Sequence, residues 1–242
     1  MTEHGDTNAS IWQSDEGINH WLAGLEDRER RYRPRWELMA QLLPFAPDDT
    51  FTFLDLGAGT GSAARTILEH YPRSKAILAD FSTQMMGEAA ALMNAYAGRF
   101  EYVEFDMAAG IWPAAVPSSV DAVVTSQCVH HLNDDRKQGL FKEIFLRLAP
   151  GGWYLNFDPV TAGDDLVEEV WQRTNDRIDP ATAEKRRNRT PEEQASFENH
   201  VRYIIPLEQQ LGYFRAAGFE ACDVYWKKLD YVIYGGRRPA AS

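Results

Sequence analysis

The sequence predicts an α/β protein built on a doubly wound sheet of seven strands, most of them parallel. Two observations carry this prediction. Short β-rich runs alternate with longer helical patterns over residues 50–159, and two strand patterns with almost no chain between them close the sequence. Apolar strands that alternate with helices form parallel sheets covered on both faces. The two closing strands add an antiparallel C-terminal hairpin, and the N-terminal segment adds a helical cap.

The first five strand patterns follow one another with helical patterns or loops between them. They lie at 51–56, 75–80, 100–106, 120–126 and 153–158. Apolar residues at helical spacing mark helices at 62–71, 82–97 and 134–148. Ser82 is well placed to cap the second of these helices. The Pro-Gly-Gly run at 150–152 predicts a turn before the fifth strand.

The C-terminal part completes the sheet. Its pattern predicts a helix at 207–217 that stops at Gly218, followed by strands at 219–228 and 229–238. Because these two strands need almost no connection, they are expected to pair as an antiparallel hairpin at one sheet edge.

Four segments differ in pattern and composition. Residues 1–45 predict two amphipathic helices, hinged near Pro34, that cap the core or its mouth. Residues 46–159 form the expected cofactor-binding α/β core, and residues 207–242 complete it. Residues 160–206 are polar and charge-rich, and we expect them to form a helical insertion that acts as a lid over the substrate.

The charge of the chain argues against several classes of partner. Asp and Glu number 36 against 25 Lys and Arg, which gives a formal net charge of -11. Such a surface repels phosphate groups, so neither nucleic acid nor an anionic membrane is an expected partner. The first ten residues lack a signal-peptide pattern, and no apolar run approaches the ~18–20 residues that span a bilayer. We therefore expect a cytoplasmic protein.

The two cysteines, Cys128 and Cys222, predict neither a disulfide framework nor a metal site. They cannot build a disulfide framework and lack the spacing of a metal site, so no metal is expected. The edge hairpin and the aromatic N-terminal helices are compatible with a homodimer.

The strongest local signal is the run LDLGAGTGS at 54–62, where a strand leads through three glycines into a helix. Alternate glycines let the backbone turn tightly and let a ligand lie against bare amides. A phosphate-binding P-loop would need a Lys and a hydroxyl residue after its last glycine, and both are missing. The dinucleotide fingerprint would place a small apolar residue where Ser62 stands. Asp55, beneath the loop, either holds it by hydrogen bonds or contacts the ligand.

Acidic residues follow this loop at regular places in the fold. Asp55, Asp80 and Asp106 lie at the ends of three consecutive strands. A single acid at a strand end is usually a solvated loop cap. Three of them beside a glycine loop converge on the carboxyl edge of the sheet, where ligands of open α/β folds bind.

The pattern Asp-x-Gly-x-Gly-x-Gly resembles the signature of class I S-adenosylmethionine-dependent methyltransferases of the small-molecule type, whose fold is Rossmann-like. The Arg-Leu-Ala-Pro-Gly-Gly stretch at 147–152 and the closing hairpin also match that family. The resemblance covers roughly residues 50–159 and 207–238. It implies S-adenosyl-L-methionine as the cofactor and a small molecule as the methyl acceptor.

The resemblance also implies roles for individual residues around the cofactor. Asp80 would bind the ribose, Asp106 the adenine amino group, and Met107 would pack on the adenine ring. Phe81 could supply a second apolar wall, while Ser126 and Gln127 would offer backbone groups to the methionine moiety. The complete predicted set is Asp55, Gly57, Gly59, Gly61, Asp80, Phe81, Asp106, Met107, Ser126 and Gln127.

Methyl transfer by in-line displacement asks the protein mainly to position a nucleophile, and a base is needed only if that nucleophile arrives protonated. His130 and His131 follow the fourth strand and are candidate bases, although a role in holding the loop is favoured for both. Asp158 is the best candidate for substrate contact, with a loop cap as the alternative.

Three further residues are candidate substrate contacts. Asn156 shares the face of Asp158 at the tip of the fifth strand. Tyr32 and Arg35 belong to the N-terminal cap, and in related small-molecule methyltransferases aromatic and basic residues of this segment help to enclose the ligand.

Three other functions compete with methyl transfer to a small molecule. An enzyme that modifies the cofactor itself, as in carboxy-S-adenosylmethionine synthesis, and a non-catalytic nucleoside-binding protein are both compatible with this fold. A nicotinamide-dependent dehydrogenase is the third, and Ser62 together with the Gly-x-Gly-x-Gly spacing argues against it.

Overall fold

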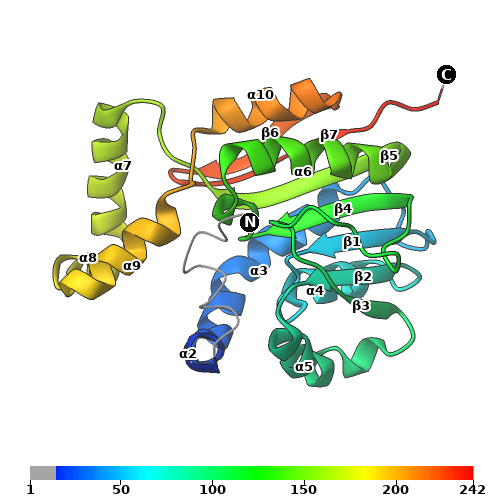
Figure 1. Ribbon diagram of the computed structural model, residues 1–242, viewed down its shortest axis with the longest axis horizontal. Coiled ribbons are helices and arrows are strands. Elements are labelled where there is room, and N and C mark those ends of the chain that lie inside the picture. Colours follow the sequence, from blue (N-terminus) through cyan, green and yellow to red (C-terminus); the bar gives the residue numbers. More distant parts are fainter. Residues whose placement is uncertain (1–14, 242) are drawn as a thin grey trace.

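A computed structural model describes residues 15–241, and it confirms the predicted fold class (Figure 1). Its sheet has seven strands in the order β3-β2-β1-β4-β5-β7-β6; the first five pair in parallel, and β7 pairs antiparallel with both β5 and β6. The strands are β1 Thr52–Leu56, β2 Lys75–Asp80, β3 Phe100–Glu104, β4 Val120–Ser126, β5 Leu148–Pro159, β6 Glu220–Lys228 and β7 Tyr231–Arg237.

Helices surround this sheet and extend from it. They are α2 Asp15–Ala23, α3 Leu25–Leu42, α4 Ser62–His70, α5 Thr83–Leu92, α6 Asp134–Arg147, α7 Asp165–Ile178, α8 Pro180–Arg187, α9 Pro191–Val201 and α10 Leu207–Ala217. Two short 3-10 helices, η1 Asn94–Tyr96 and η2 Val129–His131, complete the set. The part of the predicted N-terminal cap before Asp15 lies outside the described residues.

Alternation along the strands builds a core on each face of the sheet. Phe53 of β1 packs with α3 and α4, where Trp36 and Ile67 are buried, and its neighbour Leu54 faces the opposite side. That second side is covered by α6 and α10, with Phe141 among its buried residues. Burial of one such side chain contributes about 1.5–3 kcal/mol to the free energy of unfolding, so packing on both faces holds the strands in register.

The strand order places a topological switch between β1 and β4. From β1 the chain moves outward to β2 and β3, and it then returns to β4 on the other side of β1. Ligands of open α/β sheets bind at such a point, outside the carboxyl ends of the strands. The glycine loop after β1 and the segment after β4 both start there.

The N-terminal helices divide at a different residue from the one predicted. The break lies at Gly24, between α2 and α3, and Pro34 sits inside α3 without ending it. Pro34 is exposed, so its missing N–H leaves a carbonyl to solvent, while buried Trp36 and Met39 hold the next turn on the core. Glycine has a low helix propensity, which favours the break at Gly24.

Two other boundaries also differ from the prediction. Strand β5 begins at Leu148 and takes in the Pro-Gly-Gly run that was expected to be a turn, with a register shift opposite Val120 and Ala122. Gly151 absorbs the irregularity with φ 84°, and its amide donates to the carbonyl of Arg238 at 3.0 Å. The helix expected at 82–97 ends at Leu92 and is followed by η1.

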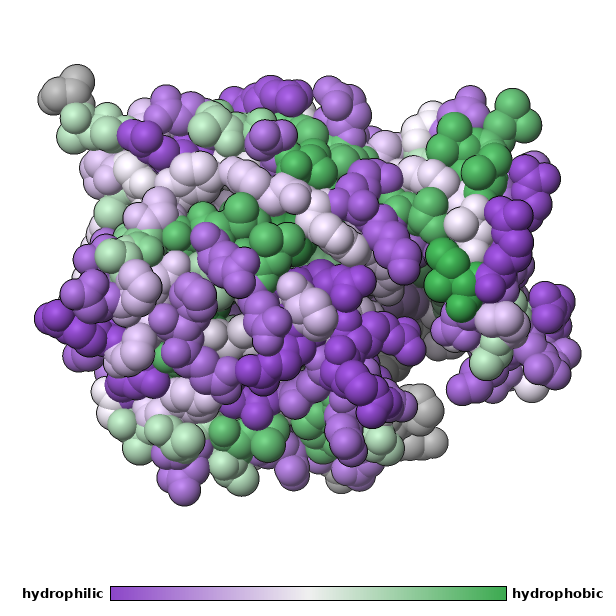
Figure 2. Space-filling view, turned by 180° about the vertical axis from the view of Figure 1, so that it is seen from behind, coloured by the Kyte–Doolittle hydropathy of each residue, from purple (hydrophilic) through white to green (hydrophobic). Residues whose placement is uncertain are grey.

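The insertion is helical, as predicted, and it projects from the body as α7, α8 and α9 (Figure 1). Helix α9 begins with a capping box between Thr190 and Glu193. Apolar side chains of α7 are exposed and contribute to the green surface of the projecting part in Figure 2, among them Leu166, Val170 and Ile178. Within residues 15–241, no helix has both the length and the apolar character that a membrane crossing requires.

Replacement of Gly235 by Ala is expected to destabilise the sheet by about 3 kcal/mol. A Cβ at this position of β7 would overlap the carbonyl oxygen of Tyr154 and lie 2.8 Å from the Leu155 side chain, so β5 and β7 would have to separate. Gly212→Ala is the matched control, because Gly212 lies in α10 with no atom near its missing Cβ, and helix propensity predicts a gain of up to ~1 kcal/mol. Urea denaturation measures both; a loss at Gly235 no larger than 1 kcal/mol would contradict this packing.

Candidate functional site

The loop after β1 turns the chain at three glycines in the left-handed region, which L side chains rarely adopt. Gly57, Gly59 and Gly61 have φ values of 70°, 53° and 74°. Gly61 is the N-cap residue of α4, so the first amides of that helix lie beside the loop. The amide of Gly57 donates to the carbonyl of Ala79 at 2.8 Å, which fixes the loop to β2. The loop is thus folded against β2, with glycines at its three left-handed positions.

Asp55 lies beneath this loop. Its side chain is 1% exposed, and its Oδ2 accepts a hydrogen bond at 3.1 Å from the amide of Ala64 in the first turn of α4. Burial raises the pKa of Asp55 to about 8, and the bond from Ala64 acts in the opposite direction. Of the two roles left open by the sequence, these contacts support the one in which Asp55 holds the loop and the helix start together.

Asp80, at the end of β2, holds the loop from the other side. Its Oδ2 accepts the amide of Gly59 at 2.8 Å, and its Oδ1 accepts the amide of Ser82 at 2.9 Å. Burial raises the pKa of Asp80, while the backbone hydrogen bonds lower it. Each carboxylate oxygen has more than one acceptor position, so Asp80 can hold Gly59 and still accept bonds from a ribose diol.

The predicted adenine contacts flank the same loop. Asp106 follows β3, is exposed, and accepts the amide of Ala108 at 2.8 Å. The Met107 side chain is half-buried, and its Cε lies 3.3 Å from the position of a Cβ on Gly57. Phe81 is half-buried directly after β2. These positions are compatible with an adenine site, and the individual contacts stay predictions.

The segment that follows β4 packs directly on the glycine loop. A Cβ at Gly57 would lie 2.6 Å from Cβ of Cys128, and the Cys128 thiol donates to the carbonyl of Leu56 at 3.1 Å. Gln127 has φ 58°, an uncommon value for a non-glycine residue, and its amide donates to the carbonyl of Phe157 at 2.8 Å. The surrounding structure therefore holds residues 126–131 in one conformation beside the loop.

Helix α3 of the cap is fastened to this edge by polar contacts. Nε1 of Trp36 donates to the hydroxyl of Ser126 at 2.8 Å. Glu29 accepts a hydrogen bond from Ser62 at 2.6 Å and forms an ion pair with Arg65. Because Ser62 is the first residue of α4, the cap is tied to the helix that follows the glycine loop.

Tyr32 and Arg35 lie at different places on the cap. The ring of Tyr32 packs edge-on against Phe157 near the end of β5, with 5.4 Å between ring centroids, and its hydroxyl is 3.4 Å from that of Tyr231. The guanidinium of Arg35 instead lies over the ring of Trp226 in β6, 4.6 Å from its centroid. These contacts hold Tyr32 near the end of β5 and Arg35 at the antiparallel edge of the sheet.

Asn156 belongs to the core of the sheet. It is fully buried, its Oδ1 accepts from the hydroxyl of Thr125 at 2.7 Å, and its Nδ2 donates to the hydroxyl of Tyr234 at 2.8 Å. Tyr234 in turn donates to Gln210 of α10. This network uses both ends of the amide and fixes Asn156 at the strand tip, and its role as a substrate contact stays a prediction.

His130 and Asp158 form a buried pair. Nδ1 of His130 lies 2.7 Å from Oδ1 of Asp158, with the two side chains 4% and 0% exposed. Burial lowers the pKa of His130 to about 3 and raises that of Asp158 to about 7. A neutral imidazole can donate its Nδ1 proton to Oδ1 of the carboxylate. The Nε2 lone pair of His130 is then unused, and among residues 15–241 this buried atom has no hydrogen-bond partner.

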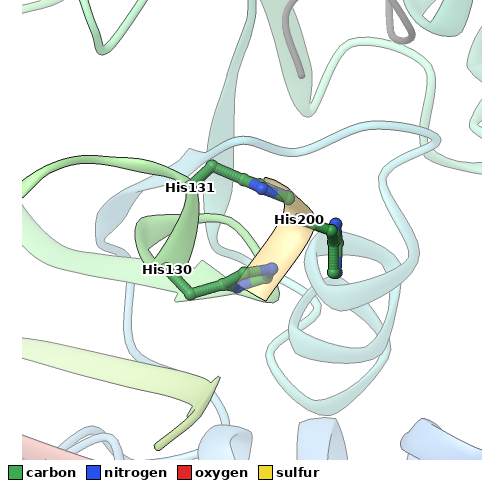
Figure 3. Close-up of side chains that lie close together, drawn as sticks. All are labelled: His130, His131 and His200. Carbon is green, nitrogen blue, oxygen red and sulfur yellow. The ribbon is translucent and has the colours of Figure 1, made fainter. Parts of the chain in front are cut away.

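Two more imidazole rings lie against this pair (Figure 3). One ring nitrogen from each of His130, His131 and His200 lies within 4.8 Å of the other two. His130 and His131 belong to η2, while His200 comes from the last turn of α9 in the insertion. Burial lowers the pKa of His131 and of His200 as well. Sequence reasoning missed His200, because only the folding of the insertion over η2 brings it to this edge.

Comparison with known proteins relates the glycine loop and the strands around it to methyltransferases. Residues 53–152 match a family model described as a methyltransferase domain. Trans-aconitate 2-methyltransferase of Azoarcus sp. (strain BH72) is 28% identical over 128 residues, which are 53% of this chain and 46% of that protein. The chain spans about half the length of the curated relatives it matches.

Two solved structures share the fold. An O-methyltransferase family protein from Burkholderia thailandensis aligns over 98% of this chain and 64% of its own, with a TM-score of 0.71 and 18% identity. Human N-acetylserotonin methyltransferase, solved in complex with S-adenosylmethionine, covers 95% of this chain and 58% of its own, with a TM-score of 0.61 and 16% identity.

Residues 53–152 therefore match a methyltransferase domain, in agreement with the resemblance to class I S-adenosylmethionine-dependent methyltransferases that the sequence predicts. The predicted cofactor, S-adenosylmethionine, agrees with this match and with the complex of the human protein. The roles of single residues within the site stay predictions.

The contact between the glycine loop and Cys128 can be tested by two alanine substitutions. Gly59→Ala meets only ordinary contacts, the nearest at 3.5 Å, so left-handed strain alone should cost about 1 kcal/mol of stability. Gly57→Ala adds a clash with Cys128 to the same strain and should cost at least twice as much. Urea denaturation of the two variants measures the difference, and equal losses would show that the loop does not pack on Cys128 as described.

Proposed function

We propose that this chain transfers a methyl group from S-adenosylmethionine to a small-molecule acceptor by in-line displacement. The observation that carries the proposal is that two segments touch at one edge of the sheet. The glycine loop, with Asp80 bonded to its Gly59 amide, lies in contact with the segment that leads from Cys128 to His130. A cofactor on the loop and an acceptor beside η2 would be neighbours.

The residues present fit the cofactor. Three left-handed glycines leave the loop backbone bare, Asp80 keeps acceptor capacity for a ribose, and Asp106 and Met107 flank the loop. The bound cofactor supplies an electrophilic methyl group on its sulfonium. The chain supplies position and a site from which water is excluded, and orientation of two reactants can contribute up to ~7–11 kcal/mol of barrier reduction.

The acceptor side is formed by the ends of β4 and β5 with the cap and the insertion above them. His130, Asp158 and Tyr32 lie there, and His200 adds a contact from the insertion. We propose that these side chains bind and orient the acceptor. A small carboxylic acid is the first acceptor class to consider, because the relatives are named trans-aconitate 2-methyltransferases and a carboxylate has no proton to lose before attack. A homodimer, a cytoplasmic location and the absence of nucleic-acid binding stay predictions from the sequence.

Removal of the Asp80 carboxylate is expected to weaken binding of S-adenosylhomocysteine at least tenfold. A hydrogen bond to a charged group contributes about 1.5–3 kcal/mol, and Asp80→Ala removes the predicted bonds to the ribose together with the hold on Gly59. Isothermal titration calorimetry measures the dissociation constant.

Two further variants separate ligand contact from folding. Asp106→Ala changes an exposed side chain and is expected to weaken the same ligand about tenfold without lowering the melting temperature. Glu101→Ala, an exposed carboxylate in the middle of β3, should leave binding unchanged. A wild-type chain that binds neither S-adenosylmethionine nor its demethylated product would refute the proposed function.

The identity of the product distinguishes the proposed reaction from its alternatives. With methyl-labelled S-adenosylmethionine and trans-aconitate or related small acids, label is expected in a methylated acid and S-adenosylhomocysteine as the second product. Mass spectrometry identifies both. A cofactor that gains mass without giving up its methyl group would indicate the cofactor-modifying enzyme, and binding without any transfer would indicate a nucleoside-binding protein.

A further inference from the structure

We propose that His130, His131 and His200 bind a divalent transition-metal ion whose remaining coordination position faces the methyl acceptor. The binding of the ion stands on the geometry of the three rings alone. The assignment of its open position to the acceptor rests on the function proposed above.

The first support is the distance between the three ligand atoms. Metal–nitrogen bonds of about 2.0–2.1 Å in a tetrahedral site require nitrogen–nitrogen separations of about 3.4 Å. One ring nitrogen from each histidine already lies within 4.8 Å of the others, so the rings need to approach by at most about 1.4 Å. Figure 3 shows the three side chains close together.

The second support is the unused lone pair on His130. Nε2 of this ring is buried, has no hydrogen-bond partner among the described residues, and belongs to a side chain that is 4% exposed. A buried polar atom without a partner costs about 1–3 kcal/mol, so such an atom calls for a ligand. Burial also keeps the rings neutral, which is the form of imidazole that binds a metal.

Asp158 provides the outer contact that metal-bound histidines usually have. Its carboxylate accepts the Nδ1 proton of His130 at 2.7 Å and thereby directs the Nε2 lone pair away from itself. A carboxylate in this position fixes the tautomer and raises the basicity of the ligand. Asp158, His130 and an ion would thus form the carboxylate–histidine–metal arrangement that is common in metal sites.

The charges around the rings also favour a cation. Lys137 is the nearby positive group, and its buried ammonium donates to the carbonyl of Tyr203 and lies 3.8 Å from Asp134. Asp134 balances that charge, and Asp158 adds a negative charge beside His130. The environment of three neutral imidazoles thus carries a net negative charge when both carboxylates are ionised.

The ligand set indicates which ions would bind. Imidazole suits zinc, copper, iron, cobalt and nickel, whereas magnesium and calcium prefer oxygen ligands. Three protein ligands leave a position open for water or substrate, as in catalytic zinc sites. His131 and His200 keep partial exposure, so the open position can be reached from solvent. An anionic acceptor oxygen could occupy it, and the ion would also tie α9 to η2.

Titration of the full chain, prepared without a histidine tag, tests the proposal. Calorimetry is expected to show one Zn²⁺ ion bound per chain with micromolar or tighter affinity. Addition of Co²⁺ should produce the visible absorption of a tetrahedral cobalt site. Mg²⁺ should give neither signal.

Three variants test whether Zn²⁺ binds at these histidines. His200→Ala removes one ligand from a partly exposed position on the insertion and should weaken Zn²⁺ binding at least 100-fold. Asp158→Asn keeps all three ligands and should weaken binding 10–100-fold. His70→Ala is the matched control, because His70 is an exposed histidine at the end of α4 and should leave binding unchanged.

Two outcomes would overturn the proposal: no stoichiometric Zn²⁺ binding by a folded wild-type chain, or binding that His200→Ala leaves as strong as before. Titration of the same preparations with S-adenosylhomocysteine separates this result from the proposed function. His200→Ala should keep its affinity for that ligand, whereas failure of the methyltransferase proposal would abolish ligand binding in the wild type and leave the Zn²⁺ titration unaffected.

Discussion

The missing side chain of Gly57 is the constraint on which the site depends. Cys128 occupies the space that a Cβ at Gly57 would need, so the loop after β1 and the segment after β4 approach each other at backbone distance. The parallel register of β1 and β4 brings their carboxyl ends level, and the glycine lets the two segments close on each other. Ligand-binding backbone on one side and chemistry-bearing side chains on the other thereby become neighbours.

The fold could be predicted because its signals are local and repeated. Each strand of the parallel part is a short apolar run, and the amphipathic pattern of 134–148 coincides with α6 almost residue for residue. The glycine loop was visible for the same reason, since its left-handed turns can be made by few other residues. Asp80 was found by its place at a strand end, and its bond to the Gly59 amide agrees with that placement.

The errors arose where tertiary packing outweighs a local signal. Pro34 was expected to divide the N-terminal helices, but buried residues on its C-terminal side hold α3 together, and the break falls at Gly24. Alternation along the strand predicted that Asn156 shares a face with Asp158, but it did not reveal the hydrogen bonds of Asn156 with Thr125 and Tyr234. A sequence pattern shows which face a residue occupies and does not show which partners it meets there.

The position of His200 beside His130 and His131 could not be predicted from the sequence. Its neighbours in α9 are exposed or half-buried polar and apolar residues, and nothing in their spacing distinguishes it from a surface histidine. It becomes chemically significant only because α9 folds back onto η2. The pair His130–His131 was visible in the sequence, but a pair of adjacent histidines has many structural uses, and the third ring changes what the group can bind.

The way the fold is built explains which parts of the site could be predicted from the sequence and which could not. The cofactor side uses backbone geometry and strand-end acids, which every chain of this architecture must place at the same edge, so a motif records it. The proposed acceptor side combines the core with the helical insertion, and no local motif marks it. Selectivity for the acceptor should therefore depend on contacts between the insertion and η2, and the approach of His200 to His130 is the contact through which the insertion could impose it.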